Sequence, residues 1–145
     1  MDAVTDAPTQ QLLRYAAVAF AVALLIHGAD HARRGMEVVS SQIQWAGNTQ
    51  AVLGVITVVL VFLRHRWGPY AAIGIGFASA IGFTAAHLLP SWGVFSDSVL
   101  TPAAGAGVTW FSWLTALLEI AADLAFGWAG LTAWRQTRTA TPTTA

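Results

Sequence analysis

Four long apolar stretches, separated by short polar segments, dominate the pattern of this sequence. They cover about residues 12–34, 45–64, 69–89 and 113–134. A helix needs roughly 20 apolar residues to cross the hydrocarbon core of a bilayer, and each stretch is of that order. The pattern therefore predicts an all-α integral membrane protein, whose four transmembrane helices form an antiparallel bundle.

The ends of these stretches are typical of helix boundaries. Arg33 and Arg34 precede Gly35, which places cations in the last turn and a glycine at the C-cap. Pro69 follows the second stretch closely and is suited to begin the third helix. The connection between the second and third helices is therefore short, and we expect these two helices to be neighbours.

The remaining segments complete the predicted organisation. Residues 1–10 are predicted to be an N-terminal cytoplasmic tail, residues 11–135 the transmembrane domain and residues 136–145 a disordered C-terminal tail. Residues 91–107 contain Pro102 and a run of alanine and glycine, which predicts an external loop. The composition agrees with a membrane protein, since only 10% of the residues are charged, against about 25% in soluble proteins.

The distribution of the seven basic residues predicts the orientation. Cytoplasmic segments carry an excess of basic residues. Arg33 and Arg34 follow the first span and lie on one side. The other side has Arg14, Arg64, Arg66, Arg135 and Arg138. We therefore expect a multi-pass protein of the plasma (inner) membrane with both termini in the cytoplasm.

The chemically informative residues are the histidines and carboxylates within the apolar stretches. Such residues are costly in hydrocarbon, so they usually face a bundle interior, a partner or a cavity. His27 and His31 are four residues apart in the first span, and Glu119 and Asp123 are four residues apart in the fourth. Each pair thus shares a helix face. With His87 at the end of the third span, these side chains all lie in the outer half of the predicted bundle.

This set predicts a transition-metal site with His27, His31, His87, Glu119 and Asp123 as ligands. Imidazole and carboxylate ligands suit zinc, iron, manganese or Cu(II). The chain has no cysteine, which excludes thiolate ligands and cysteine nucleophiles. Haem b held between His27 and His87 is an alternative cofactor.

Two further functions are compatible with the same residues. Histidines and buried carboxylates can pass protons, so a proton or cation relay is one alternative. The other is a non-catalytic accessory or assembly subunit of a larger membrane complex, or a homodimer. A stripe of small side chains on the third span would suit close helix packing; it consists of Gly74, Ala78, Gly82 and Ala86, with Gly76, Ala80, Thr84 and His87 beside it.

Structural roles for the polar residues remain alternatives. Glu119 and Asp123 would then pair with the histidines to fix the register of the bundle. Asp30 and His31 would face water as a local ion pair, and His87 would bond a carbonyl freed at its helix end. The net charge is zero and no basic run occurs, so we expect lipid and not nucleic acid as a partner. No enzyme motif identifies catalytic residues.

Overall fold

The computed structural model describes residues 7–139, and its regular structure is entirely helical in that range. The elements are α1 (Ala7–Arg34), a short 3-10 helix η1 (Met36–Val38), α2 (Ser41–Phe62), α3 (Gly68–His87) and α4 (Trp110–Thr139). Residues 1–6 and 140–145, which make up most of the two predicted tails, lie outside the described residues. The prediction of an all-α fold is confirmed for the described part of the chain.

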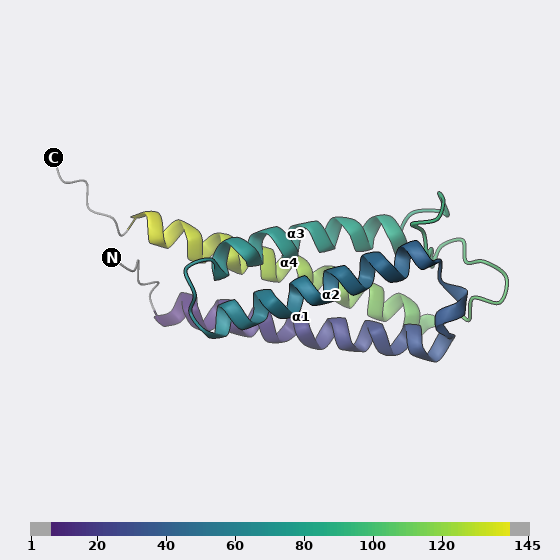
Figure 1. Ribbon diagram of the computed structural model, residues 1–145, viewed down its shortest axis with the longest axis horizontal. Coiled ribbons are helices and arrows are strands. Elements are labelled where there is room, and N and C mark those ends of the chain that lie inside the picture. The colour runs from purple at the N-terminus through teal and green to yellow at the C-terminus, as the bar shows by residue number, and fades with distance from the viewer. Residues whose placement is uncertain (1–6, 140–145) are drawn as a thin grey trace.

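The four long helices lie side by side along the longest axis of the molecule (Figure 1). Residues 88–109, which connect α3 to α4, lie at one end together with η1. We call this the loop end. The turn between α2 and α3 lies at the opposite end, as do the first residues of α1 and the last of α4. Helix α4 packs on α1 and α3, and α2 packs on the same two helices.

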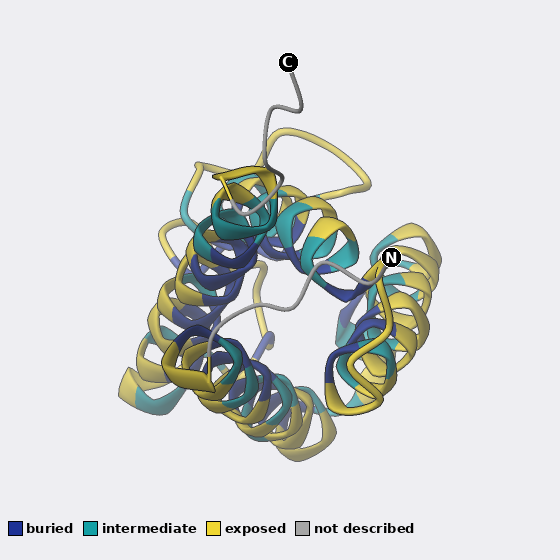
Figure 2. Cartoon of the chain, turned by 90° about the vertical axis from the view of Figure 1, so that its left-hand side faces the viewer, coloured by how far each residue is buried: buried dark blue, intermediate teal, exposed yellow. Residues whose placement is uncertain are grey.

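Many large apolar side chains of the helices are exposed, while several polar ones are buried with the apolar core. Figure 2 shows that each helix has a buried side and an exposed side. Leu25 and Ile81 are 73% and 72% exposed, whereas Glu119 and Asp123 are fully buried. A water-soluble protein has the reverse distribution, because apolar burial drives its folding. All four helices are long and apolar enough to cross a membrane, as predicted.

The helix boundaries follow the predicted signals, although two helices are longer than expected. Gly35 ends α1 with φ of +90°, a conformation that favours glycine. Pro69 stands in the first turn of α3, as expected. Helix α1 begins at Ala7, ahead of the apolar stretch, and α4 continues to Thr139. The prediction of a disordered tail is therefore wrong for residues 136–139, which are helical.

Helices α3 and α4 approach each other very closely at Gly76. A Cβ atom on Gly76 would lie 2.4 Å from the backbone N of Gly127 and 2.7 Å from the carbonyl O of Asp123. Only glycine allows two backbones to approach so closely. The neighbouring stripe of small residues faces outward, since Gly74 and Gly82 are exposed and a Cβ atom on either would have open space around it.

Candidate metal centre

Three histidines from two helices meet at the loop end of the bundle. His27 and His31 come from α1 and His87 from the last turn of α3, and one ring nitrogen of each lies within 4.8 Å of the others. His27 and His87 are buried and His31 is half-buried. Helical periodicity explains the first pair, because residues four apart lie on one face. The four-residue spacing and the position of His87 in the third span thus predicted three side chains that the fold brings together.

The protonation of His87 is fixed by the loop. Its Nδ1 lies 3.0 Å from the backbone carbonyl oxygen of Asp97. A carbonyl only accepts hydrogen bonds, so Nδ1 must carry the proton and donate it. The lone pair of His87 is therefore on Nε2. Metal-binding histidines are commonly held in this way, with one ring nitrogen bonded to a carbonyl or carboxylate and the other free for the ion.

His27 and His31 face each other through their Nε2 atoms, which are 3.0 Å apart. One of these nitrogens donates a proton to the other, and a metal ion bound by both would replace this hydrogen bond. Ligand nitrogens on a tetrahedral zinc ion lie about 3.3 Å apart, given Zn–N distances of about 2.0–2.1 Å. The pair therefore has nearly the spacing that such an ion requires. The Nδ1 atoms of both residues have no hydrogen-bond partner within residues 7–139 and are free to hold the displaced proton.

Asp97 lies behind the histidines and is tied to α1 by Arg34. The two side chains form a bidentate ion pair, with Nη1–Oδ2 and Nη2–Oδ1 distances of 2.8 and 2.6 Å. Oδ2 of Asp97 is also 3.9 Å from Nδ1 of His31 and 3.6 Å from Nδ1 of His87. Burial alone would raise the pKa of Asp97, but the hydrogen bonds and charge of Arg34 outweigh it and hold the pKa below its ordinary value. Asp97 is thus an anion close to both histidines, and its backbone carbonyl orients His87.

The loop that carries Asp97 is folded back over the end of α3. The backbone N–H of Asp97 donates to the carbonyl of Ala86, and the N–H of Val99 donates to the carbonyl of His87. These bonds satisfy carbonyls that the end of a helix leaves free. Arg34 further donates from Nε to the carbonyl of Ala106 at 2.8 Å. The loop is therefore held against the end of α3, beside His87.

A second ion pair lies beside the first and joins α1 to the start of α4. Arg33 donates to Oδ1 of Asp30 at 2.7 Å, and also to the carbonyl of Gly107 and to Oγ of Ser112. Asp30 is only 1% exposed. The alternative in which Asp30 and His31 face water as an ion pair is therefore wrong. Asp30 is a buried partner of Arg33, and His31 bonds to His27.

Glu119 and Asp123, the two predicted carboxylate ligands, are not members of the three-histidine group. They lie on the buried face of α4 together with Ser112, Ala116 and Gly127, as the spacing predicted. All four carboxylate oxygens lack a hydrogen-bond partner within the described residues. Their assignment as ligands of the same ion as the histidines stays a prediction.

The geometry of the histidines does not fit a haem held between His27 and His87. Axial imidazoles lie on opposite faces of the porphyrin, so the whole macrocycle must pass between the two rings. The rings of His27 and His87 are in edge contact, with centroids 4.8 Å apart, and the ring of Phe83 is 4.9 Å from His27. A macrocycle has no space between these rings.

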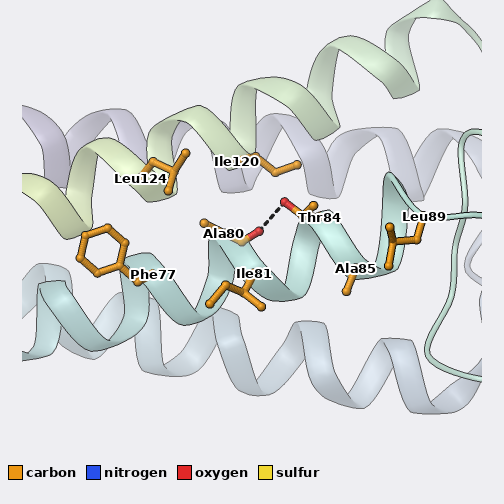
Figure 3. A pocket seen from close by; sticks show the side chains of 8 residues that line it. All are labelled: Phe77, Ala80, Ile81, Thr84, Ala85, Leu89, Ile120 and Leu124. Carbon is orange, nitrogen blue, oxygen red and sulfur yellow. Dashed lines mark hydrogen bonds between the residues drawn. The ribbon is translucent and has the colours of Figure 1, made fainter.

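A surface hollow between two helices has no histidine in its lining. It is an apolar groove of about 400 Å³ between α3 and α4, lined by residues such as Ile81, Leu89, Ile120 and Leu124 (Figure 3). The one hydroxyl drawn there belongs to Thr84, which donates to the carbonyl of Ala80 at 2.7 Å. The groove therefore offers apolar contact and no reactive group.

Sequence reasoning missed Asp97 and Arg34 as parts of this site. The sequence predicts an external loop for the segment that contains Asp97, and it indicates Arg34 only as a cation at a helix end and as one of the charges that set the orientation. One signal was present, because Asp97 is the only charged residue among residues 88–109. A single acid in an otherwise uncharged loop is a candidate for a specific partner.

Comparison with known proteins does not assign a function. No family model matches the chain, and neither a curated protein nor a solved structure matches it. Because one fold can host many unrelated functions, the function must be argued from the site itself.

Proposed function

We propose that this chain is a multi-pass protein of the plasma (inner) membrane, an antiparallel four-helix bundle with both termini in the cytoplasm. The loop end then faces outward. The arginine distribution supports this orientation. Two arginines at the outward-facing end count against it, but both form ion pairs with carboxylates. Arg33 and Arg34, the two basic residues at the loop end, are paired with Asp30 and Asp97. Most of the arginines at the other end, among them Arg64 and Arg66, are exposed.

Within this membrane protein, His27, His31 and His87 bind a transition-metal ion. The observation that supports this most strongly is the convergence of three ring nitrogens within 4.8 Å, with the lone pair of His87 directed by a backbone carbonyl. Three imidazoles suit Zn²⁺ or Cu²⁺, and iron less specifically; manganese prefers oxygen ligands. Three protein ligands leave the fourth position of a tetrahedral ion for water or a small ligand.

Metal titration of the purified full-length protein in detergent tests this function. Co²⁺ replaces zinc in such sites and gives visible absorption bands when it is held in tetrahedral geometry. We expect one Co²⁺ per chain, displaced by Zn²⁺. The variant H87A should lose this binding, whereas H65A should retain it, because His65 is an exposed histidine in the turn between α2 and α3. Equal binding by both variants would contradict the proposal.

The other predicted functions receive less support. A transmembrane proton or cation relay needs polar groups through the whole bundle, but the rings of Phe20 and Phe126 pack together in its core with centroids 5.0 Å apart. An accessory role in a larger complex, or homodimerisation, would use the exposed small residues of α3, such as Gly74 and Gly82. Such a role is compatible with a metal site.

A further inference from the structure

Glu119 and Asp123 stand out among the buried groups that the three-histidine site does not use. Both side chains are fully buried on α4, one turn apart. None of their four oxygens has a hydrogen-bond partner, and neither residue takes part in an ion pair within residues 7–139. Two carboxylates in such surroundings cannot both be ionised unless a cation compensates their charge.

Ser79 on α3 is a third buried group whose side chain has no hydrogen-bond partner among the described residues. Only 5% of the residue is exposed, and its Oγ makes no hydrogen bond within the described chain. Ser79 lies three residues beyond Gly76, whose backbone touches α4 at Asp123 and Gly127. On α3, Ser79 lies about one turn nearer the loop end than this contact. On α4, Glu119 lies about one turn nearer the loop end than Asp123. Ser79 is therefore a buried residue of α3 at the level of the two carboxylates.

Aromatic side chains lie near these polar groups in both directions along the bundle. Phe20 of α1 and Phe126 of α4 lie about one turn further from the loop end, and their rings are in contact. Toward the loop end, the ring of Phe83 lies one turn beyond Ser79 and contacts His27 and His87. Asp123 and Ser79 thus lie between the level of the Phe20–Phe126 pair and that of the histidines, and Glu119 lies one turn nearer the loop end than Asp123.

We propose that Glu119, Asp123 and Ser79 form a second site, which binds a hard divalent cation of the Mg²⁺ and Mn²⁺ class. Carboxylate and hydroxyl oxygens suit these ions, which prefer oxygen to imidazole. The charge also matches, because one divalent ion compensates two carboxylates. The site differs from the three-histidine group in ligand type, and none of its residues is a member of that group.

Binding of Mn²⁺ to the full-length protein in detergent, followed by electron paramagnetic resonance of the free ion, tests this site. We expect saturable binding of one Mn²⁺ per chain, and E119Q, D123N or S79A should weaken it by roughly 10-fold or more. The matched control is E37Q, because Glu37 is an exposed carboxylate in η1. The three variants are independent tests, so that a fold defect in one does not decide the result.

The same samples separate this proposal from the three-histidine site. H87A should still bind Mn²⁺, and E119Q should still bind Co²⁺ at the histidines. Folded protein that binds no Mn²⁺ would overturn the second site and show that its carboxyl groups are protonated. Loss of Mn²⁺ binding in H87A to the same extent as in E119Q would also overturn it, because one merged site would then include both sets of residues. Neither result depends on whether Co²⁺ binds.

Discussion

Arg34 and Asp97 form a two-pronged ion pair with N–O distances of 2.8 and 2.6 Å, although they are 63 residues apart in the sequence. Arg34 ends α1, and Asp97 belongs to the loop that covers the end of α3. Through this pair the loop is held so that the carbonyl of Asp97 reaches Nδ1 of His87. The ion pair therefore connects the stability of the loop end to the orientation of a proposed metal ligand.

Removal of the positive partner should destabilise the protein strongly. In R34Q the buried carboxylate of Asp97 loses its counter-charge, and breaking a buried pair in this way costs about 3–5 kcal/mol. We expect R135Q, a change at an exposed arginine of α4, to cost no more than about 0.5 kcal/mol. Denaturant unfolding in detergent, followed by circular dichroism, measures both. A similar unfolding free energy for the two variants would show that the pair does not hold the loop.

The ion pair also predicts a dependence of stability on pH. The pKa of Asp97 is lowered from its ordinary value of 3.8 when the protein folds. A group of this kind contributes stability that is fully present above the ordinary pKa and is lost as pH falls through the lowered one. Arg34, His31 and His87 face this carboxylate. All other acids titrate in both proteins, so the difference between wild type and D97N in the acid range reports on Asp97 and its ion pair.

We therefore expect metal-free wild-type protein to lose its advantage over D97N as the pH falls below about 4. Thermal unfolding at a series of pH values measures this difference. A constant difference between wild type and D97N from pH 7 down to the acid limit would contradict an ionised, paired Asp97.

The contact at Gly76 predicts a sharp difference between two glycines of the same helix. In G76A the new methyl group would meet the backbone of α4, which cannot move aside without separating the helices. Overpacking of this kind costs about 1–3 kcal/mol. G74A is the matched control, because a Cβ at Gly74 has no neighbour within 4 Å. Equal unfolding free energies of the two variants would show that α3 and α4 do not approach each other this closely.

The packed rings of Phe20 and Phe126 predict that the protein does not conduct protons or metal ions. Liposomes that contain the protein and a trapped pH or zinc indicator should respond to an external gradient no faster than empty liposomes. The packed apolar core at this level provides no polar path. Saturable flux that is abolished in E119Q would instead favour the relay that the sequence also permits.

The four apolar helices and several of their ends could be predicted from the sequence because they depend on local properties. Length and hydropathy identify a span, and Gly35 and Pro69 are boundary signals that act within one turn. The packing of α3 was less predictable. Two adjacent stripes of small residues were present, and only the rotation of the helix in the bundle places Gly76 inward and Gly74 outward.

The candidate site could be predicted only as far as local helix spacing and the position along each span allowed. Spacing on one helix was enough to place His27 beside His31, and position along the bundle placed His87 at the same end. Whether Glu119 joins them depends on how α4 is rotated and on side-chain directions, which the sequence does not determine. Asp97 required the path of an irregular loop, and its role becomes visible only through its contacts with Arg34 and His87.

X-ray absorption spectroscopy of the zinc-loaded, desalted protein tests the three-histidine centre most directly. We predict zinc that remains bound, nitrogen neighbours at about 2.0–2.1 Å and the outer-shell scattering of three imidazole rings. The variant H27A should show the loss of one ring or of the metal. Zinc that is removed by desalting, or a first shell of oxygen atoms without imidazole scattering, would contradict the assignment of His27, His31 and His87 as a metal centre.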